Sequence, residues 1–236
     1  MWQKHAYKLH SLEHKVRKAK GMTHAGDSGI SQPYVIGVCG GSGSGKTTFC
    51  RQLVNFLGKD HVLHISQDAY YKDLTHLSFE QRQQINFDHP DIIEFSLLVS
   101  HLDELAIGKC VTLPMYDFAK HCRLIGNQIV TPKPIVIVEG VLLFNDSDTE
   151  KRINHKIFID APEEVRFERR LKRDVRERGR TAESVQNQFK ATVSPMHNIY
   201  VEPGKNKADL VVSGEQSFEP IIAELSLKVL REVWAN

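Results

Sequence analysis

The chain has 236 residues, of which 41% are hydrophobic and 25% charged, and this composition predicts a soluble folded domain rather than a disordered chain. No apolar run reaches the ~18 residues of a membrane-spanning helix, and no secretory signal pattern is present, so we expect a cytoplasmic protein without a membrane partner. The four cysteines form no CxxC pair, which argues against a zinc finger or a disulfide framework and favours a reducing compartment.

Positive charge is concentrated at the N-terminus. Residues 1–33 hold six basic and two acidic residues (+4), whereas 25 basic and 27 acidic residues elsewhere give −2. The overall charge of +2 is too small to suggest a nucleic-acid partner. Residues 26–33 have the composition of a linker, so we expect a basic, flexible arm over 1–33 and one domain over 34–236. A membrane or nucleic-acid role of the arm, or metal binding by His10 and His14, is the alternative.

From residue 34 onward, apolar runs alternate with helical stretches. Strands are predicted at 34–39, 62–66, 135–139, 156–160 and 210–213, and helices at 47–57, 95–107, 163–176 and 218–233. This alternation indicates βαβ units, and hence an α/β fold with a parallel sheet flanked by helices.

The first predicted strand runs directly into a glycine-rich loop that opens the first predicted helix. Residues 40–47 match GxxxxGK[ST], a phosphate-binding loop whose backbone N–H groups surround phosphate oxygens, with Mg²⁺ bound beside them. Lys46 would reach the β- and γ-phosphates, and the Thr47 hydroxyl would bind the Mg²⁺. The expected contacts with ATP or GTP are Gly40, Gly41, Ser42, Gly43, Ser44, Gly45, Lys46, Thr47 and Thr48.

Two carboxylates follow predicted strands. Asp68 comes after the second strand, and Glu139 ends the third. The carboxyl ends of parallel strands share one edge with the phosphate loop, so both carboxylates are expected near the γ-phosphate. Asp68 is the candidate base for an acceptor hydroxyl and a partner of the metal shell, and Glu139 is a candidate metal ligand. Strand-end capping is the alternative.

Arginines crowd into residues 165–181, where a helix is expected to end at Gly179. Such a segment is typical of a lid that brings guanidinium groups onto the transferred phosphate. A solvated helix face paired with Glu168, Asp174 and Glu177 is the alternative.

A further stretch, 114–123, combines Tyr116, Phe118 and His121, which suit the faces and the polar edge of a planar base. Upstream, residues 86–91 offer carboxylates for a ribose diol. A surface hairpin with ordinary aromatic packing accounts for the same pattern.

From residue 34 onward the chain resembles the uridine kinase (uridine–cytidine kinase) family. The resemblance is carried by six segments in the family's order: 40–47, 66–73, 86–91, 116–123, 139–140 and 177–180. The resemblance implies a P-loop nucleoside kinase with a small β-hairpin over the nucleoside and an Arg-rich lid. It also implies transfer of the γ-phosphate of ATP or GTP to the 5′-hydroxyl of uridine or cytidine, pyrimidine salvage, a homotetramer, and feedback inhibition by pyrimidine triphosphates.

The resemblance assigns a role to each matching residue. Asp68 would activate the 5′-hydroxyl; Tyr71, Tyr116, Phe118 and His121 would hold the nucleoside; Asp88, Arg170 and Gln188 would bind the ribose; Thr47, Asp68 and Glu139 would organise Mg²⁺; and Arg173, Arg178 and Arg180 would contact the phosphates.

The chain departs from the family pattern at residues 92–95, where the helix below the ribose site is expected to shift, and at 203–205. A phosphoribulokinase-like or pantothenate-kinase-like enzyme, or a nucleotide-binding scaffold without activity, is the alternative function.

Overall fold

The computed structural model describes residues 32–235. All of the proposed arm but its last two residues, including His10 and His14, lies outside the described part. At the centre is a five-stranded parallel sheet of order β2-β5-β1-β6-β7. Its strands are β1 (Tyr34–Gly40), β2 (Val62–Ser66), β5 (Ile135–Gly140), β6 (His155–Asp160) and β7 (Leu210–Ser213).

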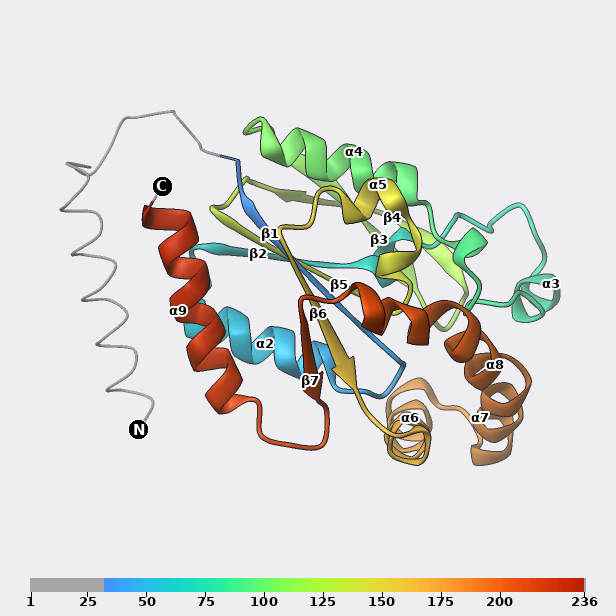
Figure 1. Ribbon diagram of the computed structural model, residues 1–236. Helices are drawn as coiled ribbons and strands as arrows, with labels where there is room; N and C mark the ends of the chain where they lie inside the picture. Colours follow the sequence, from blue (N-terminus) through green and yellow to red (C-terminus); the bar gives the residue numbers. More distant parts are fainter. Residues whose placement is uncertain (1–31, 236) are drawn as a thin grey trace.

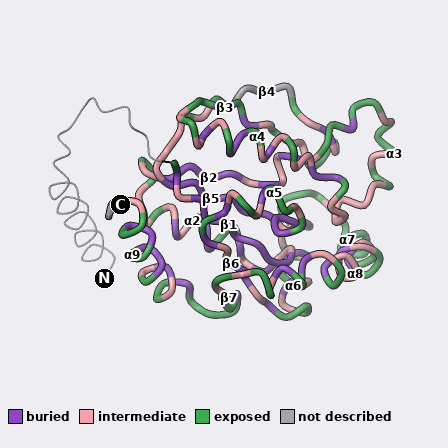
Figure 2. The backbone as a smooth tube through the Cα atoms, turned by 45° about the horizontal axis from the view of Figure 1, so that its top comes forward, coloured by how far each residue is buried: buried purple, intermediate pink, exposed green. Residues whose placement is uncertain are grey.

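Helices cover both faces of this sheet, which explains why its inner strands are continuous apolar runs (Figure 1). On one face lie α2 (Lys46–Leu57) and α9 (Glu219–Ala235), and on the other lie α4 (Phe95–Ala106), α5 (Ser147–Glu150) and the 3₁₀ turn Leu143–Asn145. Buried backbone runs through the middle of the molecule in Figure 2, where every residue of β5 is buried.

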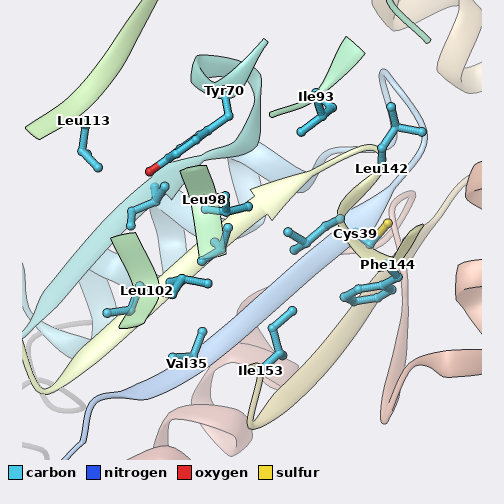
Figure 3. Packing of buried hydrophobic residues seen from close by; sticks show 14 of the residues in the cluster. Val35, Cys39, Tyr70, Ile93, Leu98, Leu102, Leu113, Leu142, Phe144 and Ile153 are labelled. Carbon is cyan, nitrogen blue, oxygen red and sulfur yellow. The ribbon is translucent and has the colours of Figure 1, made fainter. Parts of the chain in front are cut away.

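Each face of the sheet has its own hydrophobic core. In α4, Leu98, Leu102 and Leu105 are spaced by four and three residues, so they share one buried stripe against the sheet. Figure 3 shows Leu98 and Leu102 in the buried cluster that also contains Val35 of β1. On the opposite face α2 and α9 pack against the sheet in a second buried cluster.

The remaining elements gather around the carboxyl ends of the strands. An antiparallel hairpin, β3 (Val111–Asp117) and β4 (Cys122–Val130), projects beyond the sheet, together with α3 (Phe79–Gln83) and the 3₁₀ turns Gln67–Tyr70 and Pro90–Ile92. Helix α6 (Glu163–Arg178) is followed by α7 (Ala182–Gln188), π-helical turns at Phe189–Val193 and His197–Val201, α8 (Ser194–Met196), and the 3₁₀ turn Glu202–Lys207. None of the helices in residues 32–235 is both long and apolar enough to span a bilayer.

The predicted α/β architecture is confirmed, and the predicted strands and long helices occur with ends shifted by at most two residues. Helix α6 continues to Arg178 and ends at Gly179, whose φ of 63° lies in the left-handed region that glycine tolerates. The helical turns between residues 182 and 207 were not predicted, because short α-, π- and 3₁₀-helical turns carry no regular apolar period.

Replacement of Leu98 by alanine removes a fully buried side chain from the α4 core. We expect a loss of about 2–5 kcal/mol in the free energy of unfolding, because the cavity closes only partly. Urea unfolding of the variant measures this loss. Leu227→Ala, at an exposed position of α9, is the control and is expected to change stability little. Equal effects of the two substitutions would contradict the assigned core.

Candidate active site

A continuous cavity of about 1170 Å³ opens at the carboxyl ends of the strands. The phosphate loop, α6, the turn after β2 and the hairpin all line it. Its walls include most of the residues that the sequence analysis singled out: Ser42, Gly43, Gly45, Lys46, Thr47, Thr48, Asp68, Tyr71, Asp88, Tyr116, Phe118, His121, Glu139, Arg170, Arg173, Arg178, Arg180 and Gln188. Gly40, Gly41 and Ser44 belong to the same loop but are not part of the wall.

The phosphate loop is held in a conformation that needs glycine. Gly40, Gly43 and Gly45 have φ values of 144°, 84° and 108°, which side-chain-bearing residues rarely adopt. A β-carbon on Gly43 would also collide with the backbone oxygen of Arg166, the residue beneath the loop. The loop therefore packs directly on the first turn of α6.

The loop lysine is buried, and its ammonium donates to the backbone oxygen of Gly41 at 2.9 Å. Burial lowers the pKa of Lys46, while the nearby carboxylates of Glu139 and Asp68 oppose this shift. The ammonium thus lies between the loop backbone and the acidic groups of the cavity.

Two oxygen ligands for a cation lie side by side at the start of α2. The Thr47 hydroxyl donates to Oε2 of Glu139 at 2.9 Å, and Nε2 of His64 lies 3.2 Å from Oε1 of the same carboxylate. Burial alone would raise the pKa of Glu139. The adjacent His64 imidazole and the Lys46 charge outweigh burial and hold this pKa below its usual value, so Glu139 carries a negative charge at neutral pH.

Asp68 lies in the 3₁₀ turn that follows β2, where its N–H donates to Oγ of Ser66 at 3.3 Å. Gln67 fixes this turn to the sheet, because its side-chain oxygen accepts from the N–H of Leu142 at 3.0 Å and it packs against Gly140. Burial raises the pKa of Asp68, and the Lys46 charge opposes this rise. The two carboxylates that the sequence placed at one sheet edge do lie together.

One buried carboxylate serves several arginines of the predicted lid. Asp174 is fully buried, and one of its oxygens lies 2.8 Å from Nη2 of Arg173 and 3.5 Å from Nη1 of Arg178. Its other oxygen lies 3.5 Å from Nε of Arg170 and 3.7 Å from Nη1 of Arg180. The solvated-face interpretation therefore does not hold for these arginines, which converge on one buried counter-charge and line the cavity.

Helix α6 also touches the phosphate loop directly. Arg170 donates to Oγ of Ser42 and to Oε1 of Gln188, both at 3.0 Å, and Arg169 donates to the backbone oxygen of Ser44 at 3.3 Å. Arg166, another arginine of the predicted lid segment, is buried behind the loop and donates to the backbone oxygen of Ala161.

Aromatic side chains form the opposite end of the cavity. The ring centroids of Tyr71 and Tyr116 are 5.1 Å apart, and those of Tyr116 and Phe118 are 5.5 Å apart. His121 stacks on Phe87 with a centroid distance of 4.9 Å and an interplanar angle of 23°. The aromatic stretch predicted from the sequence is thus part of the cavity wall rather than an isolated surface hairpin.

Asp88 lies between this aromatic end and the arginines. The Thr192 hydroxyl donates to its Oδ2 at 3.1 Å. Burial raises the pKa of Asp88, and the Arg170 charge opposes the rise. In the segment that departs from the family pattern, Ile93 pairs with Tyr71 in a β-bridge and Glu94 binds Arg123 of the hairpin at 2.5 Å. This segment therefore ties the hairpin to the turn after β2.

Sequence reasoning missed several residues that shape the site: His64, Gln67, Phe87 and Thr192, together with the central role of Asp174. The role of Asp174 could have been predicted, because it stands four residues from both Arg170 and Arg178 and so shares a helix face with them. The others act through contacts distant in the sequence, which spacing cannot reveal.

Comparison with known proteins identifies the family of this chain. Residues 35–217 match the phosphoribulokinase/uridine kinase family. The chain belongs to this family. A uridine kinase of Chloroflexus aggregans is 47% identical over 182 residues, which cover 77% of this chain and 87% of that protein. A uridine kinase of Clostridium perfringens is 41% identical over 204 residues, 86% of this chain and 98% of that protein.

Solved structures of low sequence identity share the fold. A D-glycerate 3-kinase from Cryptococcus neoformans superposes with a TM-score of 0.55 at 15% identity, covering 92% of this chain and 97% of that chain. A protein assigned as a fructose transport system kinase from Silicibacter superposes with a TM-score of 0.61 at 18% identity, covering 85% and 98%. The predicted family and fold are confirmed, and the chain is a phosphotransferase of the P-loop kinase type.

Replacement of Asp174 by asparagine leaves its arginine partners without a counter-charge. We expect a loss of about 3–5 kcal/mol in the free energy of unfolding, because one partner of a buried ionic cluster is removed. Urea unfolding measures it. Glu168→Gln removes an exposed carboxylate of the same helix, paired with Lys172, and is expected to cause no measurable change. An unchanged unfolding midpoint for Asp174→Asn would contradict the assigned role.

Proposed function

We propose that this protein transfers the γ-phosphoryl group of ATP or GTP to the 5′-hydroxyl of uridine or cytidine, forming UMP or CMP. The observation that carries the proposal is the continuity of the cavity, which has a phosphate loop at one end and an aromatic pocket with a carboxylate at the other. Relatives at 41–47% identity that are named uridine kinase support the same acceptor.

At the donor end, the loop N–H groups and Lys46 would hold the phosphates, and Arg173, Arg178 and Arg180 would neutralise charge on the transferred group. Thr47 and Glu139 fit a Mg²⁺ site, since they offer hard oxygen ligands 2.9 Å apart, one of them charged. Magnesium bound there would offset the negative charge of the β- and γ-phosphates.

At the acceptor end, the ribose hydroxyls would contact Asp88, Arg170 and Gln188. Arg170 donates to Gln188, and its charge acts on Asp88. The pyrimidine would lie among Tyr71, Tyr116 and Phe118, with His121 at its polar edge. Burial and the charges of Arg180, Arg82 and Arg178 lower the pKa of His121, so the imidazole is neutral and offers one donor and one acceptor.

Asp68 is placed to link the two ends. Its carboxylate interacts with Lys46 on the phosphate side. On the acceptor side, burial and then the Asp68 charge raise the pKa of the Tyr71 hydroxyl. The raised pKa of Asp68 makes it a stronger base than an ordinary aspartate. The 5′-hydroxyl would transfer its proton to Asp68 as the oxygen attacks the γ-phosphorus and the bond to the nucleoside diphosphate breaks.

The finer features of this activity are part of the same proposal. The residues of the site support Mg²⁺ as the metal and ATP or GTP as donor. The composition of the sequence supports an N-terminal arm beside the kinase domain and a cytoplasmic location. The family resemblance alone supports a homotetramer and a role in pyrimidine salvage.

The direct experiment measures ATP consumption with Mg²⁺ in the presence of uridine, cytidine, adenosine, thymidine, ribulose 5-phosphate or pantothenate. Turnover restricted to uridine and cytidine is expected, because the acceptor end combines aromatic side chains with the Asp88 carboxylate. Turnover with ribulose 5-phosphate or pantothenate would show that the acceptor is not a pyrimidine nucleoside. No turnover with any of them, despite ATP binding, would favour a nucleotide-binding scaffold.

Replacement of Asp68 by asparagine keeps the size of the side chain and removes its ability to accept a proton. We expect ATP binding to be nearly intact and kcat to fall by at least ~100-fold. Calorimetry and a coupled assay measure the two effects. Asp60→Asn, an exposed aspartate in the turn between α2 and β2, is the matched control. A kcat close to that of the unmodified protein would remove Asp68 from the role of base.

A further inference from the structure

Three side chains with different metal-binding atoms meet behind the phosphate loop. Cys50 lies in α2, one turn after Thr47; His64 lies in β2; and Glu139 lies near the end of the adjacent strand β5 (Figure 1). The Cys50 sulfur, a His64 ring nitrogen and a Glu139 oxygen all lie within 4.8 Å of one another. Among the described residues this is the one such group of three.

The three residues are largely shielded from solvent. Cys50 is fully buried and Glu139 is 5% exposed, whereas the His64 side chain is 28% exposed. Nε2 of His64 itself is buried and, although it lies 3.2 Å from Oε1 of Glu139, has no hydrogen bond of acceptable geometry to any described residue. A buried ring nitrogen without a hydrogen bond is costly unless another group, such as a cation, satisfies it.

The separation of these atoms suits a tetrahedral cation. With Zn–S of about 2.3 Å and Zn–N and Zn–O of about 2.0–2.2 Å, neighbouring ligand atoms stand about 3.3–3.6 Å apart. Nε2 of His64 and Oε1 of Glu139 already lie 3.2 Å apart. The Cys50 sulfur lies within 4.8 Å of the other two ligand atoms, so a shift of little more than about 1 Å brings it to the tetrahedral separation. Water would supply the fourth ligand, as in open zinc sites.

The ligand set also selects the metal. Mg²⁺ prefers oxygen, whereas sulfur and imidazole ligands favour Zn²⁺ and other borderline or soft divalent cations. We propose that Cys50, His64 and Glu139 form a second cation site, which binds Zn²⁺-like ions. On binding, the Cys50 thiol releases its proton to solvent, and the thiolate coordinates the metal.

The second site shares Glu139 with the site proposed for Mg²⁺. Its Oε2 is held by the Thr47 hydroxyl, and its Oε1 faces His64. A cation bound to Cys50 and His64 withdraws part of the Glu139 charge from the phosphate side. Zn²⁺ therefore inhibits turnover and higher Mg²⁺ relieves it. This consequence rests on the proposed function, whereas binding itself does not.

The test uses the full chain freed of metal and Co²⁺ as a spectroscopic probe. We expect a thiolate-to-cobalt charge-transfer absorption that Zn²⁺ abolishes by displacement. Cys50→Ser should remove this absorption and weaken Zn²⁺ binding by at least about tenfold, and His64→Gln should weaken binding similarly. Thermal unfolding verifies that each variant is folded, and Cys50→Ala serves if the serine variant is not.

Two control variants separate this site from other candidate ligands. Cys110→Ser removes an exposed cysteine, and His10→Gln with His14→Gln removes the spaced pair of the N-terminal arm. Both should retain the absorption. Absence of the absorption from the unmodified protein, or Zn²⁺ affinity unchanged in folded Cys50 and His64 variants, would overturn the proposal. The absorption in a protein that phosphorylates no nucleoside would support the cation site while contradicting the proposed kinase activity.

Discussion

A buried carboxylate allows several guanidinium groups to face one phosphate-binding cavity. Arg170, Arg173, Arg178 and Arg180 all lie within 4 Å of Asp174, which is fully buried in α6. Without this charge the arginines would repel one another, and their side chains would no longer be held on the face of α6 that packs against the phosphate loop. The cluster costs desolvation energy, and the arrangement it maintains is suited to a ligand that brings several negative charges.

The same helix joins the two halves of the cavity. Arg170 is bonded to Ser42 of the phosphate loop and to Gln188 of α7, and it faces Asp88 of the acceptor end. A shift of α6 would therefore be transmitted both to the donor phosphates and to the ribose. If the proposed contacts are made, both substrates would contact α6, which gives a structural reason for phosphate transfer to depend on an acceptor.

Local signals in the sequence predicted much of this molecule. The glycine pattern of 40–47 fixed the phosphate loop, and the strand ends placed Asp68 and Glu139 at one edge, because parallel strands share their carboxyl ends. Contacts between distant segments were out of reach: no spacing links Thr192 to Asp88 or His64 to Glu139. The burial of Arg166 was also unforeseen, because its charge suggested exposure although its aliphatic stem packs beneath Gly41.

The proposed phosphate transfer requires the acceptor oxygen to lie at Asp68 while the ribose diol faces Asp88 and Arg170. Phosphorus–proton NMR of the product formed from uridine and ATP identifies the phosphorylated oxygen directly. The arrangement predicts a phosphorus signal coupled to the 5′-methylene protons, as the sole nucleotide product beside ADP. Coupling to the 2′ or 3′ proton, or release of inorganic phosphate in place of a uridine phosphate, would contradict it.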